Sequence, residues 1–272
     1  MLKLPKLDCK ATEESIENFI SDSVEKSKRD GVVLGISGGL DSACIAALAA
    51  RALGTEKVLG VQMNEDTIPD PDFSSYNPKN YSDMFDSNAV IKKLGIKSKH
   101  KLIGPLMQQY KNTLDITNDE KLELGNIKAR TRMTILYYYA NKENRLVAGT
   151  GDKSEILTGY FTKYGDGGVD ILPIGNLYKT HVRELSKEIG VPKRIIIKPS
   201  SPGLWKGQTA EDELGIKYET LDPILFSLVD KNLKISDIDY DRKTVEYVDR
   251  LIKRSSHKRE PLPKADVIYH ES

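Results

Sequence analysis

The sequence has little of what marks several large classes of protein. Its 272 residues include only two cysteines, one tryptophan and five phenylalanines. The charges are nearly balanced, with 41 Lys and Arg residues and 40 Asp and Glu residues. The distant pair Cys9 and Cys44 excludes a disulfide-rich scaffold, and we interpret both as structural thiols. A formal charge of +1 gives no general attraction for nucleic acid or an anionic membrane, so any anionic partner must be bound locally.

Long apolar runs and metal-ligand spacings are also missing. No apolar run approaches the roughly 18 residues that cross a bilayer, and the first residues lack the apolar stretch and cleavage site of a secretory signal. We therefore expect a cytoplasmic protein with no membrane partner. The histidines at 100, 181, 257 and 270 do not have the spacing of zinc ligands, so a zinc site is not expected.

Strand-length apolar runs alternate with helix-length amphipathic stretches, which is typical of parallel α/β architecture. The expected strands are 31–36, 57–63, 96–103 and 145–150, with a short extended segment at 169–174. The expected helices are 11–28, 41–53, 82–94, 119–142, 179–190, 218–229 and 242–256. The segments 64–80 and 203–215 combine Pro or Gly with polar residues, which suits loops that become ordered over a bound ligand.

The segment Gly35-Ile36-Ser37-Gly38-Gly39-Leu40-Asp41-Ser42 lies between an expected strand and an expected helix. Backbone N–H groups and the helix dipole converge on an anion at such a junction, so we interpret the segment as a phosphate-binding loop. It contains neither the Walker Gly-Lys-Ser/Thr pattern nor the dinucleotide GxGxxG pattern. Its Asp41 would repel phosphate unless a divalent metal lay between them. The alternative is a glycine-rich turn capped by Ser37 and Asp41.

The sequence Ser-Gly-Gly-Leu-Asp-Ser at 37–42 resembles the SGGxDS loop of the PP-loop ATP pyrophosphatases. The resemblance implies a Rossmann-like, doubly wound parallel sheet with helices on both faces. It also implies cleavage of ATP between the α and β phosphates: a substrate oxygen attacks the α-phosphate, pyrophosphate is released, and a nitrogen or sulfur nucleophile then displaces AMP.

Longer stretches resemble the NAD synthetases within this superfamily. They are Gly149–Glu155 followed by Gly159–Asp170, then Leu172–Thr180, and finally Ser201–Thr209 with Asp212–Gly215. The match covers, with gaps, about residues 30–222. It implies that ATP is a co-substrate and that deamido-NAD is adenylated and then amidated to NAD, the last step of NAD biosynthesis.

The chemistry of that reaction assigns roles to particular residues. A carboxylate brought against a triphosphate needs metal ligands and cations to offset the repulsion. Asp41 and Glu155 each follow an expected strand and are the candidate Mg²⁺ ligands, although acidic residues also suit helix N-termini without any metal. Similarity assigns ATP contacts to residues 35–42, Thr150, Lys179 and Ser201. It also places Asp166 near the attacking ammonia, so the candidate catalytic residues are Asp41, Glu155, Asp166 and Lys179.

Five residues are assigned by the resemblance to deamido-NAD: Arg130, Lys163, Asp170, His257 and Lys258. Arg and Lys can bind the phosphates or the nicotinate carboxylate, and a carboxylate can accept hydrogen bonds from ribose hydroxyls or an amide. The basic run 253–259 that contains the last two residues could also be a frayed, solvated tail.

Glutamine-dependent versions of the enzyme carry an additional glutaminase domain, for which the roughly 30 residues before the first strand leave no room. We therefore expect free ammonia as the nitrogen source and a single domain. Residues 1–30 would form a helical extension, 31–222 the catalytic core and 223–272 a helical tail. The family further implies a homodimer, with the helix at 119–142 as an interface element. Two departures are the long 64–90 segment and Asn176, where aspartate is expected.

Two alternatives remain open from the sequence. Another PP-loop enzyme that amidates a substrate or modifies tRNA fits less well, because the chain has no paired cysteines for thiolation and no basic excess for RNA. A non-catalytic ATP-binding module would be expected to lack a metal ligand or the lysine. Asp41, Glu155 and Lys179 are all present.

Overall fold

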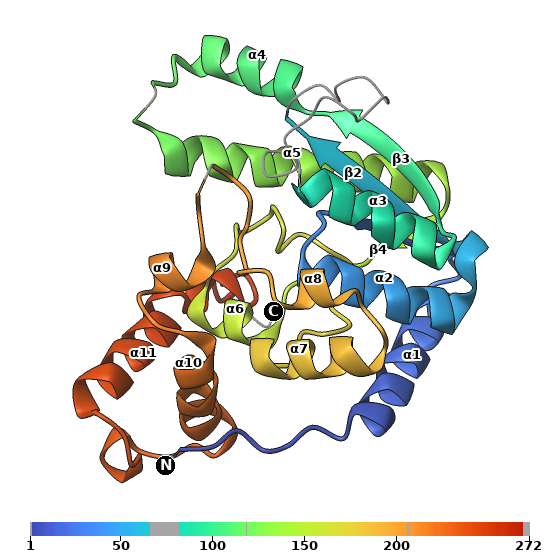
Figure 1. Cartoon of the computed structure of the whole chain (residues 1–272). Coiled ribbons are helices and arrows are strands. Elements are labelled where there is room, and N and C mark those ends of the chain that lie inside the picture. The colour runs from blue at the N-terminus through green and yellow to red at the C-terminus, as the bar shows by residue number, and fades with distance from the viewer. Residues whose placement is uncertain (1, 66–81, 118, 206, 269–272) are drawn as a thin grey trace, which may run out of the picture.

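A four-stranded parallel sheet with the order β3-β2-β1-β4 forms the centre of the fold (Figure 1). The computed structural model describes residues 2–65, 82–117, 119–205 and 207–268. The strands are β1 Gly31–Gly35, β2 Val58–Asn64, β3 Lys97–Leu102 and β4 Arg145–Val147. The order changes direction between β1 and β4, and ligands of such sheets bind at the carboxyl ends of the strands at this point.

Helices cover both faces of the sheet. Along β1, Val32 and Leu34 pack in one core with α2 Leu40–Leu53, whereas Val33 between them packs in another with α5 Lys121–Lys142. The first core also includes side chains of α1 Cys9–Lys26, α3 Ser82–Leu94 and α7 Lys179–Glu188. The prediction of a doubly wound parallel sheet is therefore confirmed.

Helix α2 is buried along most of its length, from Leu40 to Ala49. Its alanines leave little side-chain bulk, which lets α2 pack closely between the sheet and the helices α1 and α7. Cys44 is fully buried among them, and burial raises the pKa of its thiol to about 12. Both cysteines are free, and Cys44 has the inert setting expected of a structural thiol.

A second group of helices has an apolar core of its own. It comprises α6 Lys153–Thr158, α9 Ala210–Leu214, α10 Tyr218–Leu225 and α11 Arg242–Arg254, and α10 continues as a π-helix over Phe226–Asp230. Leu157 of α6 packs in this core beside Leu221 and Val248. Helix α6 also contacts α7. The second group therefore fixes the two helices that carry Glu155 and Lys179.

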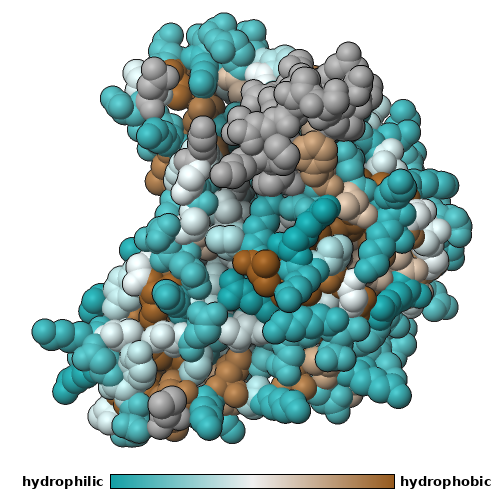
Figure 2. All heavy atoms as spheres, in the orientation of Figure 1, coloured by the Kyte–Doolittle hydropathy of each residue, from teal (hydrophilic) through white to brown (hydrophobic). Residues whose placement is uncertain are grey.

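Helix α4, Gly104–Leu114, was not expected from the sequence, and only Met107 within it is buried. Figure 2 shows apolar side chains among hydrophilic ones over α4 and the facing part of α5. The large exposed ones include Leu106, Tyr110 and Leu114 on α4 and Leu122 near the start of α5. The short helices are α8 Lys193–Ile196 and the 3-10 turns Thr55–Lys57, Ile235–Asp237 and Ser256–Lys258.

Three other expectations meet different outcomes. The fourth strand ends at Val147 rather than at 150, and the extended segment 169–174 contributes only an isolated bridge between Ala148 and Ile171. Most of the 64–80 segment lies outside the described residues. Among the helices of the described ranges, none combines the length and the apolar character needed to span a bilayer.

Candidate active site

The loop from Gly35 to Ser42 leaves the carboxyl end of β1 and enters α2. Its turn is stabilised by the Gly39 N–H, which donates to Ser37 Oγ at 3.1 Å. Gly38 has a φ of +83°, and a Cβ there would lie 2.1 Å from the carbonyl oxygen of Asp83, so glycine is required. No side chain of the described residues caps the N-terminus of α2. The first backbone N–H groups of the helix are therefore available to an anion.

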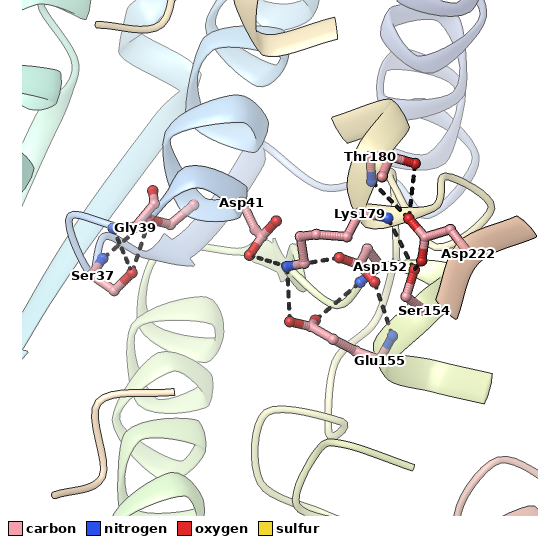
Figure 3. A network of polar contacts seen from close by, with 10 residues as sticks. Ser37, Gly39, Asp41, Asp152, Ser154, Glu155, Lys179, Thr180 and Asp222 are labelled. Atoms are coloured by element: carbon pink, nitrogen blue, oxygen red, sulfur yellow. Dashed lines mark hydrogen bonds and ion pairs between the residues drawn. The ribbon is translucent and has the colours of Figure 1, made fainter. Parts of the chain in front are cut away.

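Lys179, the first residue of α7, lies at the centre of an acidic cluster (Figure 3). Its Nζ is 2.7 Å from Asp41 Oδ2, 2.7 Å from Asp152 Oδ2 and 2.9 Å from Glu155 Oε1. The side chains of Lys179 and Asp152 are fully buried, while those of Asp41 and Glu155 remain 21% and 19% exposed. The structure thus brings three predicted residues together with Asp152, which lies in the stretch Gly149–Glu155 but had been assigned no role.

Asp152 and Glu155 form a capping box at the start of α6. The Glu155 N–H donates to Asp152 Oδ1 at 2.9 Å, and the Asp152 N–H donates to Glu155 Oε2 at 3.3 Å. This reciprocal pair orients both carboxylates and leaves one oxygen of each beside Lys179. The Asp-x-x-Glu spacing after β4 was the sequence signal that could have identified Asp152.

Asp222 of α10 anchors the backbone on the other side of Lys179 (Figure 3). Its buried carboxylate accepts from Ser154 Oγ at 2.6 Å, and from the N–H and Oγ1 of Thr180 at 2.9 and 2.8 Å. Ser154 Oγ in turn accepts from the Lys179 N–H at 3.0 Å. These contacts tie the starts of α6 and α7 to each other.

Burial favours the neutral form of every group in the acidic cluster. For Lys179 this effect is outweighed by the attraction of Asp152, Asp41 and Glu155, so its pKa lies well above the ordinary value and the ammonium stays charged. Burial raises the pKa of Asp152 to about 6 and also raises the pKa of Glu155. The neighbouring carboxylates add to both shifts, and the single ammonium of Lys179 does not offset them. The cluster is short of positive charge.

The acidic cluster fits a divalent cation. Asp41, Asp152 and Glu155 each place a carboxylate oxygen within 4.8 Å of the others, and such oxygens are the donors that Mg²⁺ prefers. Asp41 Oδ1 and Asp152 Oδ2 are both buried without a hydrogen-bond partner, although Asp152 Oδ2 forms an ion pair with Lys179, so Asp41 Oδ1 is an unused metal donor. Three negative charges and one ammonium would be balanced by a charge of +2. The residues present therefore fit the Mg²⁺ expected at Asp41 and Glu155.

A cavity of about 600 Å³ opens beside this cluster and has the size of a nucleotide-binding site. Most of the residues assigned to ATP line it, and so do Asp166 and Lys258. The predicted residues in its wall are Gly35, Ile36, Ser37, Gly39, Leu40, Asp41, Ser42, Thr150, Glu155, Asp166, Ser201 and Lys258. Gly38 and Lys179 lie behind the wall, and Arg132 and Trp205 line the cavity without having been assigned a role.

Three of the five residues assigned to deamido-NAD form a chain of contacts. Arg130 Nη2 donates to the Lys163 carbonyl at 3.3 Å, and Lys163 Nζ donates to the His257 carbonyl at 2.6 Å. The next residue, Lys258, donates from Nζ to the carbonyls of Gly159 and Phe161, at 2.7 Å each. Lys258 is therefore held by the fold and is not part of a frayed tail.

Asp170 and Asp166 occupy different settings. Asp170 is not part of the chain of contacts formed by Arg130, Lys163 and His257. It accepts hydrogen bonds from Tyr137 Oη at 2.9 Å and from the Val147 N–H at 2.8 Å. Its contacts brace the edge of β4. Asp166 opens into the cavity and accepts from the Thr162 N–H at 2.9 Å. The walls of the cavity desolvate the Asp166 carboxyl group and raise its pKa.

A loop that leaves the first N–H groups of α2 uncapped, a carboxylate cluster and a nucleotide-sized cavity lie together at the switch point of a doubly wound sheet, as in the class of nucleotide-binding α/β proteins. Residues 12–262 match the family described as NAD synthase, and the chain belongs to this family. The family predicted from the sequence motifs is thereby confirmed.

Relatives and solved structures agree with this assignment. The chain is 47% identical to the NH3-dependent NAD synthetase of Thermococcus kodakarensis over 93% of its own length and 96% of the relative's. The structure of NMN synthetase from Francisella tularensis has a TM-score of 0.82 at 34% identity and covers 96% of this chain and 100% of its own. That of NH3-dependent NAD synthetase from Campylobacter jejuni has a TM-score of 0.79 at 28% identity, with the same coverage.

Proposed function

We propose that the protein is an ammonia-dependent NAD synthetase that converts ATP, deamido-NAD and ammonia into AMP, pyrophosphate and NAD. The observation that carries the proposal is that the loop 35–42, Asp41 and Glu155 line one cavity, with the buried Lys179 directly behind the two carboxylates. The curated relative of nearly the same length that is named as NH3-dependent supports ammonia as the nitrogen source.

The reaction proceeds in two balanced steps. An oxygen of the nicotinate carboxylate attacks the α-phosphorus of ATP, the bond from that phosphorus to the bridging oxygen breaks, and pyrophosphate leaves with the electron pair. Ammonia then attacks the carbonyl carbon of the acyl adenylate and loses a proton, and AMP leaves as the carbon–oxygen bond breaks. The first step brings anions together, and the second needs a protected site for the reactive acyl adenylate.

The residues around the loop serve the first step. The free N–H groups at the start of α2 bind the departing pyrophosphate, and Lys179 supplies positive charge beside it. Asp41 and Glu155 would hold Mg²⁺, which when bound offsets the negative charge of the phosphates. Thr150 and Ser201 line the same cavity and contact ATP.

The second step takes place where Asp166 faces the cavity. Its raised pKa suits a carboxyl group that exchanges a proton with the incoming ammonia. The residues assigned to deamido-NAD include Lys258, which borders the cavity, and Arg130, Lys163 and His257, which form a chain of contacts leading to it. Asp170 keeps free lone pairs for a ribose hydroxyl, although both its oxygens already accept one hydrogen bond.

The enzyme acts as a homodimer in the cytoplasm. The exposed apolar side chains of α4 and α5, which include Leu114 at 57% and Leu122 at 61% exposure, form the surface that a second copy would cover. These side chains support an interface at the helix predicted for it, 119–142, extended to α4.

The proposal is tested by incubating the protein with ATP, Mg²⁺, ammonium and deamido-NAD. NAD, AMP and pyrophosphate are expected in equal amounts, and glutamine is not expected to replace ammonium. Absence of NAD, or ADP in place of AMP, would refute it. Because one structural neighbour is an NMN synthetase, the acid form of NMN is the competing substrate. A higher kcat/KM for that mononucleotide would reassign the substrate while leaving the adenylation chemistry intact.

A further inference from the structure

The capping box explains one oxygen of Asp152 but not the other. Oδ1 accepts the Glu155 N–H, whereas Oδ2 lies 2.7 Å from Lys179 Nζ and takes no part in the cap. Ser, Thr or Asn caps a helix about as well as Asp and needs no buried charge. A fully buried carboxylate is unfavourable unless it is paired. The negative charge of Asp152 therefore has a purpose beyond the start of α6.

Lys179 shares its ammonium among three carboxylates, but these differ in their exposure. Asp41 and Glu155 border the cavity and are within reach of a ligand there, while Asp152 is fully buried and is not part of the cavity wall. A cation bound at Asp41 and Glu155 would draw both away from Lys179. The buried ammonium would then have Asp152 as its remaining carboxylate partner.

We propose that Asp152 is a positioning residue that holds the Lys179 ammonium in place while Asp41 and Glu155 release it to bind a divalent cation. The inference rests on the metal role proposed for those two carboxylates. Lys179 then acts as an internal cation of the cluster before the metal binds. Asp152 determines how strongly that internal cation competes with the metal for Asp41 and Glu155.

The experiment measures Mn²⁺ binding to the full chain by electron paramagnetic resonance, with no nucleotide present. The D152N substitution keeps an oxygen for the cap but removes the charge. In the chain with Lys179 it is expected to raise the Mn²⁺ dissociation constant about tenfold, the lower end of effects from residues that orient metal ligands. In a K179M background the same substitution should raise it by no more than about threefold, because no ammonium then competes.

Several outcomes would overturn the inference. If D152N lowers the Mn²⁺ affinity equally in both backgrounds, Asp152 is itself a metal ligand. If D152N does not lower the affinity in the chain with Lys179, Asp152 does not position the Lys179 ammonium. Absence of Mn²⁺ binding to the unmodified chain would also refute it. Because NAD formation is not the readout, an inactive chain with the expected Mn²⁺ pattern would refute the proposed function alone.

Two further variants separate charge from folding. D152S also keeps a capping oxygen without charge, and it should reproduce the tenfold loss if D152N is poorly folded. D241N changes another aspartate that caps a helix, at the start of α11, where Asp241 accepts from the Thr244 N–H. Its Mn²⁺ dissociation constant should match that of the unmodified chain, and a tenfold rise there would show that the effect comes from helix capping in general.

Discussion

Lys179 Nζ lies 2.7 Å from Asp152 Oδ2, and neither side chain is exposed. Asp41 belongs to the first turn of α2, and Glu155 belongs to α6, so the ammonium of α7 joins helices from both cores of the molecule. Removal of one partner from a buried ion pair leaves an uncompensated charge, which costs about 3–5 kcal/mol. The site is therefore also a determinant of stability.

Lys179→Met should lower the free energy of unfolding by about 3–5 kcal/mol, because three carboxylates then lose their cation. Mg²⁺ should restore part of this loss, and more than it adds to the unmodified chain, since it binds the same carboxylates. Urea unfolding with and without Mg²⁺ measures both effects. Lys187→Met, at an exposed position near the end of α7, is the matched control and should change neither. Equal stability of the Lys179 variant and the unmodified chain would contradict the account.

Asp41→Asn should reduce NAD formation by more than about 100-fold, because loss of a ligand exceeds the usual effect of losing a residue that only orients ligands. Folding should be preserved, since Asp41 is partly exposed and Lys179 keeps Asp152 and Glu155. Steady-state rates and thermal unfolding separate the two effects. Asp237→Asn, an exposed aspartate remote from the cluster, should leave both unchanged. Retained activity of the Asp41 variant would exclude the metal role.

Asp222→Ala should destabilise the fold by about 3 kcal/mol or more, because the hydroxyl of Ser154 and two donors of Thr180 lose their acceptor. NAD formation should also fall, since Asp222 fixes the starts of the helices that carry Glu155 and Lys179. Asp222→Asn keeps an acceptor oxygen and should lose less stability. Calorimetry of the two variants checks the order. Equal losses would show that the hydrogen bonds do not determine the effect.

Asp230 should make the free energy of unfolding depend on pH. Burial alone would raise its pKa, but hydrogen bonds from Lys153 and Tyr178 outweigh it and lower the pKa below 3.8. A lowered folded pKa means that ionised Asp230 stabilises the fold above pH 3.8 and that this contribution disappears as the pH falls through the folded pKa. Asp230→Asn should be less stable than the unmodified chain at pH 7, with a difference that vanishes in acid. A difference that grows in acid would contradict this.

The parts of the site carried by continuous motifs could be predicted from the sequence. The loop 35–42 and Glu155 follow from local patterns next to a strand or helix, whereas Lys179 was assigned through the resemblance of the stretch Leu172–Thr180. Asp222 could not be found in this way, because it lies 42 residues from Thr180 and its partners meet it only in the folded chain. Asp152 had a local signal in its capping box, but its ion pair with Lys179 had none.

The fold shows the same division. Buried strands can be predicted from apolar runs in the sequence, and β1, β2 and β4 are buried along most of their lengths. Helix α4 was not predicted, although Leu106, Tyr110 and Leu114 stand four residues apart, as on one face of a helix; only Met107 within it is buried. The direction of the Asp170 side chain, toward the Val147 N–H, depends on how two distant segments pack.

The central claim is that a substrate carboxylate attacks the α-phosphate of ATP. Deamido-NAD labelled with ¹⁸O in both carboxylate oxygens tests it directly when the products are analysed by mass spectrometry. The account predicts one ¹⁸O in the phosphate of AMP, one in the amide of NAD and none in pyrophosphate. Unlabelled AMP, or ADP with labelled inorganic phosphate, would contradict it.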